Sequence, residues 1–211
     1  GDTSFVYPSD HGYQGSTGDN TEDETGLPAA AKNYLHVANG GTYKYPTNVY
    51  PGSASYYTYS YYGDNNTTGG NYMSGKLNNG VFPADSNPGS SNNDWAVFFL
   101  SQGAPELYFN LPESIYINNI SLVYRNYVPS NYGQAIINSV AVGEADGSYS
   151  LTYAYNVTHS ISAGSNNKIT LSFTEPVKAK YIRLLLSKPS EGTRVAIGEA
   201  EVWGDTTVPD I

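Results

Sequence analysis

The sequence predicts an all-β protein, and three observations lead to that fold class. Residues 179–186 and 195–204 alternate between apolar and polar positions, which is the period-2 pattern of β-strands. Several shorter β-rich runs come before them, separated by clusters of Gly and Asn that are typical of turns. Stretches with a helical pattern are scarce. Many short strands with turn signals between them favour a β-sandwich.

The expected strands follow one another along most of the chain. Before the closing pair they cover residues 35–37, 95–99, 106–111, 115–125, 135–142, 149–155 and 168–173. Asp146-Gly147, between two alternating runs, is a strong hairpin signal. Trp95 begins a continuous apolar run, so we expect its side chain in the core.

The last strand should present two different faces. Its alternation places Ala200 and Val202 on one face. The opposite face should carry Ile197, Glu199 and Glu201. We expect Glu201 to be an ordinary solvent-facing residue of this strand.

Length and composition favour one domain with flanking segments. A chain of 211 residues with 39% apolar residues is long enough to bury a core in one β-domain. Residues 1–31 have almost no apolar periodicity and are expected to form an acidic leader or linker with at most one short strand. The sandwich should cover residues 32–204, and residues 205–211 should begin a linker to a following domain.

Charge and cysteine content limit the partners. The formal net charge is -9, which disfavours nucleic acid and anionic membranes because those partners are bound through Lys and Arg. The chain has no Cys, so it forms neither disulfides nor thiolate metal sites. It also lacks an apolar run of the length, about 18 residues, that a membrane span requires. The charge therefore favours neutral ligands. Cysteine content leaves the compartment open, and we separately expect a secreted, extracellular protein that acts as a monomer.

Short segments along the chain resemble one family of β-sandwich modules. They are KNYLHVANGGTY (32–43), KLNNGV (76–81), PELYFNL (105–111), ISLVY (120–124), VAVGEADGSY (140–149) and the two closing strands. In this order they are similar to discoidin-like, F5/8 type C modules, and among them to family 32 type carbohydrate-binding modules of secreted bacterial enzymes. The resemblance implies a jelly-roll sandwich of the galactose-binding-domain-like class, without catalytic activity of its own and attached to catalytic or other domains.

The residues themselves also argue against an enzyme. The chain has three His residues, His11 in the leader, His36 in an expected strand and His159 in an expected loop. Neither a Gly-x-Ser-x-Gly nor a His-Glu-x-x-His motif is present. Glu199 and Glu201 lie too close together on one strand to flank a glycosidic bond.

The resemblance also implies a structural calcium ion. Glu199 matches the metal-binding Glu of the family's last strand, while Asn79 stands where the family has Asp. An amide oxygen still suits Ca²⁺, and Asp85 or Asp94 could supply the missing negative charge. The alternative is that Asn79 only forms a turn and that Glu199 pairs with a Lys or Arg.

A run of tyrosines offers one part of a sugar site. A Tyr ring covers the apolar face of a sugar, and its hydroxyl group reaches the polar rim. Tyr57, Tyr61 and Tyr62 lie in the densest part of the run, and the last two precede a turn signal. The alternative is that these rings face the core, because Tyr is common in strands.

A second loop, residues 125–133, mixes hydrogen-bonding and aromatic groups. It contains Arg125, Asn126, Tyr127 and Tyr132, a combination suited to sugar hydroxyl groups and ring faces. Arg194, before the last strand, is a further candidate. The alternatives are that Arg125 pairs with an acid and that Tyr132 anchors the loop.

Together these observations predict a carbohydrate-binding module. The expected ligand is a polysaccharide or its oligosaccharides, bound through loop Tyr and Arg residues. The alternative is an adhesion module that binds a protein or lipid of a cell surface, since the same fold serves both.

Overall fold

The computed structural model of the protein describes residues 31–46, 71–83, 95–99, 103–126, 131–150, 153–161 and 166–208. Regular structure in these ranges is almost entirely β, which confirms the all-β fold class. The strands are β1 (Lys32–Asn33), β2 (Thr42–Lys44), β3 (Ala96–Phe99), β4 (Glu106–Arg125), β5 (Ile136–Ala145), β6 (Ser148–Ser150), β7 (Tyr155–Ile161), β8 (Asn166–Ser187) and β9 (Arg194–Asp205). Two 3-10 turns, η3 (Val37–Asn39) and η4 (Lys76–Asn78), complete the described elements, and none of these is a helix that could cross a membrane.

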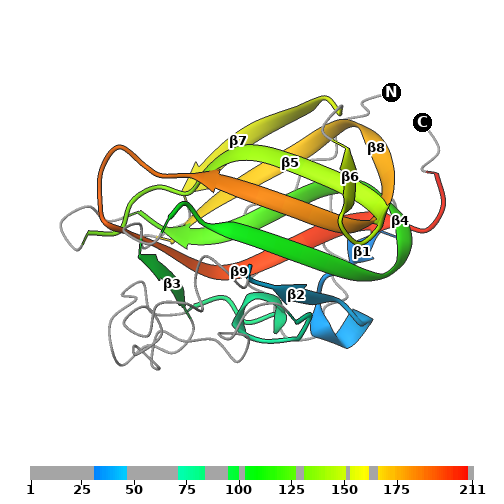
Figure 1. The fold of residues 1–211 in the computed structure, drawn as a ribbon, viewed down its shortest axis with the longest axis horizontal. Coiled ribbons are helices and arrows are strands. Elements are labelled where there is room, and N and C mark those ends of the chain that lie inside the picture. The colour runs from blue at the N-terminus through cyan, green and yellow to red at the C-terminus, as the bar shows by residue number, and fades with distance from the viewer. Residues whose placement is uncertain are drawn as a thin grey trace.

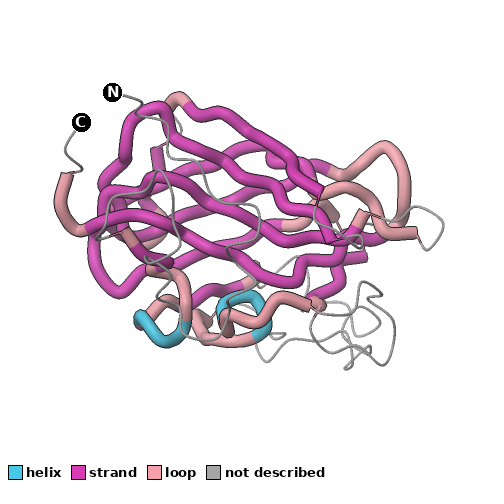
Figure 2. The backbone as a smooth tube through the Cα atoms, turned by 180° about the vertical axis from the view of Figure 1, so that it is seen from behind, coloured by secondary structure: helices cyan, strands magenta, loops and turns pink. Residues whose placement is uncertain are grey.

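Strands β4 and β8 take part in both layers of a β-sandwich. Residues 106–110 of β4 pair with β2 and with residues 181–185 of β8. Residues 115–125 of β4 pair instead with β9 and with the earlier part of β8. The first layer thus has the order β2-β4-β8-β5-β6, and in the second β9 lies beside β4, with β7 at the far edge of β8. Figure 1 shows both strands curving through the molecule, and Figure 2 shows the two short turns at one edge of it.

The bend between the layers is built from two opposed irregularities. Between Asn110 and Ile115, β4 has four residues where β8 has only Lys180. Between Ser172 and Val177, β8 has four residues where β4 has only Asn118. Extra residues on one strand of a pair bend that strand and disrupt the ladder locally. The two strands therefore turn from one layer into the other together while they remain paired.

The core lies between the layers and follows the expected alternation. In the first part of β4, Leu107 and Phe109 point inward, and in its second part Ile120 and Leu122 do so. All four belong to one apolar cluster to which both layers contribute. Burial of such side chains contributes about 1.5–3 kcal/mol each, so this cluster dominates stability.

A second, smaller cluster lies on the other face of the second layer. It consists of Trp95, Val97, Val123, Tyr132 and Ala196. Trp95 has no exposed surface, which confirms the prediction that it is a core residue.

A bulge changes the alternation of the last strand. Tyr124 pairs with Ile197, but its neighbour Val123 pairs with Glu199, so Gly198 is an extra residue. Ile197 consequently faces the main core with Ala200, and the prediction that it shares a face with the two glutamates is wrong. A Cβ atom on Gly198 would lie 2.5 Å from Cγ of Pro83, which explains why glycine occupies the bulge.

Other differences from the expected strands have local causes. Residues 106–111 and 115–125 form the single strand β4, and residues 168–173 and 179–186 both lie within β8. Residues 35–37 do not form a strand, because the Nδ1 atom of His36 accepts a hydrogen bond from Ala38 N–H at 2.9 Å and caps η3. His159 lies in strand β7 and not in a loop. The expected hairpin at Gly147 is confirmed, with a positive φ of 80° at that glycine.

The bulge yields a test of the packing on β9. We expect Gly198→Ala to lower the free energy of unfolding by about 1–3 kcal/mol, because the new methyl group overlaps Pro83. Urea unfolding measures the change. The loss should shrink in a Pro83→Ala background, where the overlapping ring atoms are absent. An equal loss in both backgrounds would show that the contact with Pro83 does not explain the glycine.

Candidate functional site

One end of the sandwich collects polar side chains from several separate elements. The bends of β4 and β8 lie at one end, and the outer ends of these strands return to the other, where the loop before β9 also lies (Figure 1). Arg125 at the end of β4 pairs with both Asn166 of β8 and Ala196 of β9. Paired strands thus bring together the end of β4, the starts of β8 and β9, and the loop before β9. We call this place the loop end.

Arg194 is held at the loop end by the segment that precedes β5. The backbone N–H groups of Thr193 and Arg194 donate to the carbonyl oxygen of Asn131 at 3.0 and 2.9 Å. Gly133 N–H donates to the carbonyl oxygen of Arg194 at 2.8 Å. The Arg194 guanidinium lies 5.9 Å from the ring centroid of Tyr132, within cation–π range.

Tyr132 itself is buried at this end. Only 3% of its surface is exposed, and its ring packs in the second cluster with Trp95 and Val123. This environment corresponds to the anchoring alternative, in which the ring fixes the loop and orients Arg194.

Arg125 and Asn126 lie beside the first residues of β8. Arg125 is half-buried and Asn126 is exposed. The Asn126 backbone N–H donates to Oδ1 of Asn167 at 3.4 Å. The structure therefore brings Arg125, Asn126 and Arg194 to one end of the molecule, as the sequence suggests.

Three further polar residues at the loop end escaped the sequence prediction. The Tyr124 hydroxyl group lies 3.0 Å from Nδ1 of His159, and Gln134 Nε2 lies 3.3 Å from the same atom. Partial burial lowers the pKa of His159, so the ring is neutral and available for hydrogen bonding at neutral pH. The sequence signal that could have predicted strand β7, which carries His159, was the alternation of Tyr155, Val157 and His159 with polar residues.

The remaining aromatic candidates cannot be placed. Tyr57, Tyr61, Tyr62 and Tyr127 lie outside the described residues. Their role in sugar binding stays a prediction.

The outer side of the second layer, which faces away from the main core, buries a group of charged side chains. Glu199 and Glu201 are 1% and 2% exposed, so the prediction that Glu201 faces solvent is wrong. Lys168 Nζ lies 3.5 Å from Oε1 of Glu201, and the Ser121 hydroxyl group lies 3.3 Å from the same oxygen. Burial lowers the pKa of Lys168 to about 8, and the carboxylates of Glu201 and Glu199 oppose that shift. A buried ammonium thus neutralises part of the carboxylate charge.

The calcium ligands named from the sequence meet here only in part. Asn79 is exposed, and its Oδ1 atom accepts a hydrogen bond from Val81 N–H at 2.9 Å, as in the turn alternative. The 3-10 turn η4, which ends at Asn79, nevertheless packs against β9, the strand that carries both carboxylates. Among the described residues no three His, Asp or Glu side chains are placed to hold a metal ion. Asp85 and Asp94 lie outside the described residues.

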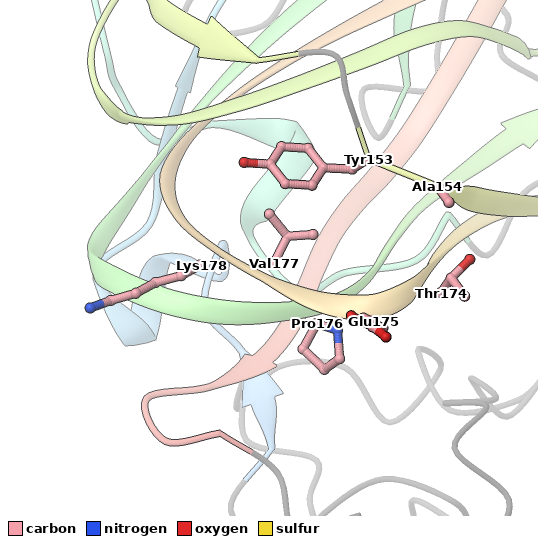
Figure 3. Close-up of a pocket in the computed structure, with 7 residues that line it drawn as sticks. All are labelled: Tyr153, Ala154, Thr174, Glu175, Pro176, Val177 and Lys178. Carbon is pink, nitrogen blue, oxygen red and sulfur yellow. The ribbon is translucent and has the colours of Figure 1, made fainter.

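A pocket of about 530 Å³ lies far from these groups, where β7 begins and β8 bends (Figure 3). Tyr153 lies above Val177, and its hydroxyl group points to the same side as the Lys178 ammonium. Glu175 and Thr174 complete the polar part of the lining. None of the side chains gathered at the loop end contributes to it.

Comparisons with known proteins give partial matches. The sequence matches no protein-family model, and no curated protein matches it. The F5/8 type C domain of a Bacteroides fragilis protein is similar at 13% identity and a TM-score of 0.42, over 54% of this chain and 74% of that one. A pectin-binding carbohydrate-binding module has 21% identity and a TM-score of 0.38, over 55% and 75%. A family 32 module produced by Clostridium perfringens has 13% identity and a TM-score of 0.36, over 52% of this chain and 76% of that one. The sandwich assignment itself rests on the strand pairing of this chain.

The buried charges lead to a prediction for Lys168. Because its pKa in the folded protein, about 8, is below the usual 10.5, the unfolded chain binds this proton more tightly between those values. The contribution of Lys168 to the free energy of unfolding should therefore be constant below pH 8 and rise from pH 8 to about 10.5. We expect a ¹³C-lysine NMR titration to show one resonance with a midpoint near pH 8, which is absent from Lys168→Met. A single group of lysine midpoints near 10.5 would contradict the described burial.

Proposed function

We propose that this chain is a non-catalytic carbohydrate-binding module that belongs to a larger secreted bacterial protein acting on polysaccharides. The observation that carries the proposal is the meeting of Arg125, Asn126, Gln134, His159 and Arg194 at one end of a rigid sandwich. Such a module would hold an attached enzyme near its polymer by raising the effective concentration.

The chemistry of the loop end suits sugar hydroxyl groups. Guanidinium groups only donate hydrogen bonds, whereas amides and a neutral imidazole both donate and accept. A sugar hydroxyl group also does both, so a mixed set of this kind can satisfy it in a fixed orientation. Anchoring by Tyr132 and by the three backbone hydrogen bonds around Arg194 reduces the ordering cost of binding.

Stacking on the sugar ring is assigned, within this proposal, to tyrosines from the sequence analysis. Tyr57, Tyr61, Tyr62 and Tyr127 are proposed to cover the apolar face of the ligand. Tyr132 is proposed to position Arg194 and to make no direct contact, because its ring is buried.

We also propose one structural calcium ion near Glu199 and Asn79, with Asp85 or Asp94 as a further ligand. Glu199 is a buried carboxylate of β9, and η4, which packs against β9, ends at Asn79; both side chains carry the oxygen ligands that Ca²⁺ prefers. The Lys168 ammonium nearby already supplies positive charge, so the ion would neutralise the remainder.

Binding is tested with a glycan array and with affinity electrophoresis in polysaccharide gels. We expect Arg194→Ala to weaken glycan binding by roughly 1–3 kcal/mol with little change in melting temperature. Arg194→Lys is the matched variant and should recover little, because the planar fork is lost while the charge remains. Lys178→Ala, at an exposed position of β8 away from the loop end, should bind like the parent.

Two results would overturn the proposal. One is failure to bind any plant, fungal or bacterial glycan together with binding to a cell-surface protein or lipid, which would establish the adhesion alternative. The other is release of reducing ends from a bound polysaccharide by the purified chain, which would show catalysis.

The calcium proposal has its own measurement. A ligand bound only by the folded state adds stability in proportion to its occupancy, so EGTA should lower the melting temperature and added Ca²⁺ should restore it. Glu199→Gln should abolish the response to Ca²⁺. An identical melting temperature with and without EGTA, with no metal detected by elemental analysis, would reject the ion.

A further inference from the structure

A second group of aromatic side chains lies on the outer face of the first layer. It consists of Tyr72, Tyr108, Tyr149 and Tyr181 with Lys44, Arg183 and Asp146, and we call it the tyrosine face. None of the four rings belongs to either apolar cluster, and each ring is half-buried. Tyr72 is the last member of the tyrosine run considered for sugar binding from the sequence, and the other six residues were not assigned to a site there.

Strand register builds the centre of this face. Tyr108 of β4 lies between Lys44 of β2 and Arg183 of β8, and Tyr181 follows in the next outward-facing row. Because side chains alternate across a strand, these residues point away from the core that Phe109 and Ile182 enter.

The remaining two rings are brought to the face by local backbone contacts. Met73 exchanges two backbone hydrogen bonds of 2.9 Å with Tyr43, which places Tyr72 beside Lys44. Tyr149 lies on the β5–β6 hairpin. A Cβ atom on Gly143 would lie 1.8 Å from the Ser148 carbonyl oxygen, so only glycine allows this hairpin to close.

Polar contacts fix the rings in place. The Tyr72 and Tyr149 hydroxyl groups donate to Oδ1 of Asp146 at 3.0 and 3.3 Å. Lys44 Nζ lies 3.8 Å from Oδ2 of Asp146 and 4.4 and 5.6 Å from the ring centroids of Tyr72 and Tyr108. The four rings therefore have defined positions before any ligand arrives, which lowers the cost of binding.

The electrostatics of the face favour a neutral ligand. Burial and the neighbouring acidic groups raise the pKa of Tyr72 well above its usual value, and burial is the main cause of a raised pKa at Tyr149, so both hydroxyl groups stay protonated. The Lys44 charge is matched by Asp146, and Arg183 lies 5.4 Å from the Tyr149 ring centroid, on the same face as Glu106. Lys180 Nζ also lies 5.2 Å from the Tyr181 ring centroid, so three cations face the carboxylates of Asp146 and Glu106. Opposite charges are thus interspersed, and the net charge of these five groups is small.

We propose that the tyrosine face is a second glycan-binding surface, which contacts a chain of neutral sugar residues along the sheet. Rings with centroids 6.1 and 6.4 Å apart present apolar area, while their hydroxyl groups and the cations that lie beside the rings offer polar contacts. The inference rests on the proposed function and deepens it. The loop end binds a short segment, and the tyrosine face adds contacts that only a long chain can reach.

Affinity electrophoresis with a long and a short ligand tests whether the tyrosine face contributes only to the binding of long chains. The probes are soluble galactomannan and xyloglucan, their oligosaccharides, and the polyanion polygalacturonate. We expect Tyr108→Ala with Tyr181→Ala to weaken binding of the neutral polysaccharides about 10-fold or more while affinity for the oligosaccharides is kept. Arg194→Ala should weaken binding of both forms.

Matched variants exclude indirect effects. Tyr116 lies 5.9 Å from Lys178 Nζ outside the tyrosine face, so Tyr116→Ala removes a comparable ring and should bind like the parent. Tyr72→Phe with Tyr149→Phe keeps the rings but removes both hydrogen bonds to Asp146, and should give a smaller loss.

Protection from amine labelling gives a second measurement that needs no variant. Galactomannan or xyloglucan should slow the labelling of Lys44 several-fold and leave the labelling of Lys178, which lies outside both surfaces, unchanged. Full polysaccharide affinity in the Tyr108 and Tyr181 variant, or unprotected Lys44 in a bound complex, would overturn the inference and leave the proposed function standing. Retention by polygalacturonate alone would overturn the neutral-ligand assignment. Absence of binding by the parent to every glycan would remove the proposed function and this inference together.

Discussion

The structure depends on the continuous pairing of β4 with β8 through the bend that joins the two layers. Four residues of β4 lie opposite one residue of β8, and four residues of β8 lie opposite one residue of β4, so both strands turn without separating. This places residues 106 and 125 of β4 at the same end of the molecule, together with the start of β9. The loop end is therefore carried by strand ends held in a common ladder, and the tyrosine face uses the first-layer parts of the same two strands, residues 106–110 of β4 and 181–185 of β8.

The sequence was sufficient for the fold class and for most of the strands, because alternation and turn residues act locally. It was insufficient where the backbone departs from alternation. The extra residue Gly198 places Ile197 and Glu199 on opposite faces of β9, whereas regular alternation would place them on the same face. Nothing in the local sequence pattern distinguishes a bulge from a regular strand. Residues 168–173 and 179–186 were expected as two strands, whereas both belong to β8, and Pro176 lies in the bend of that single strand. Arg125 and Arg194 could be selected from residue type alone, but the grouping of His159 with Tyr124 and Gln134 depends on long-range pairing.

Two surfaces of the sandwich have opposite characters. The outer side of the second layer buries Glu199, Glu201 and Lys168, where charge is neutralised internally at a cost in desolvation. The outer side of the first layer keeps its aromatic rings half-exposed, with charged groups of both signs among them. Burial of charge stabilises only when partners are held in place, whereas partly exposed aromatic rings provide area for a ligand. These differences explain why we assign a structural role to one surface and a binding role to the other.

The central claim is that the protein binds glycan through the loop end and the tyrosine face and through no other part of the described surface. The most direct measurement is a ¹H–¹⁵N NMR titration of the ¹⁵N-labelled chain with a glycan that it binds. The account predicts shift changes at Arg194, Gln134 and His159 with an oligosaccharide, and additional changes at Tyr108 and Tyr181 with the long chain. Changes centred on the pocket around Tyr153 and Lys178, with the loop end and the tyrosine face unaffected, would contradict it.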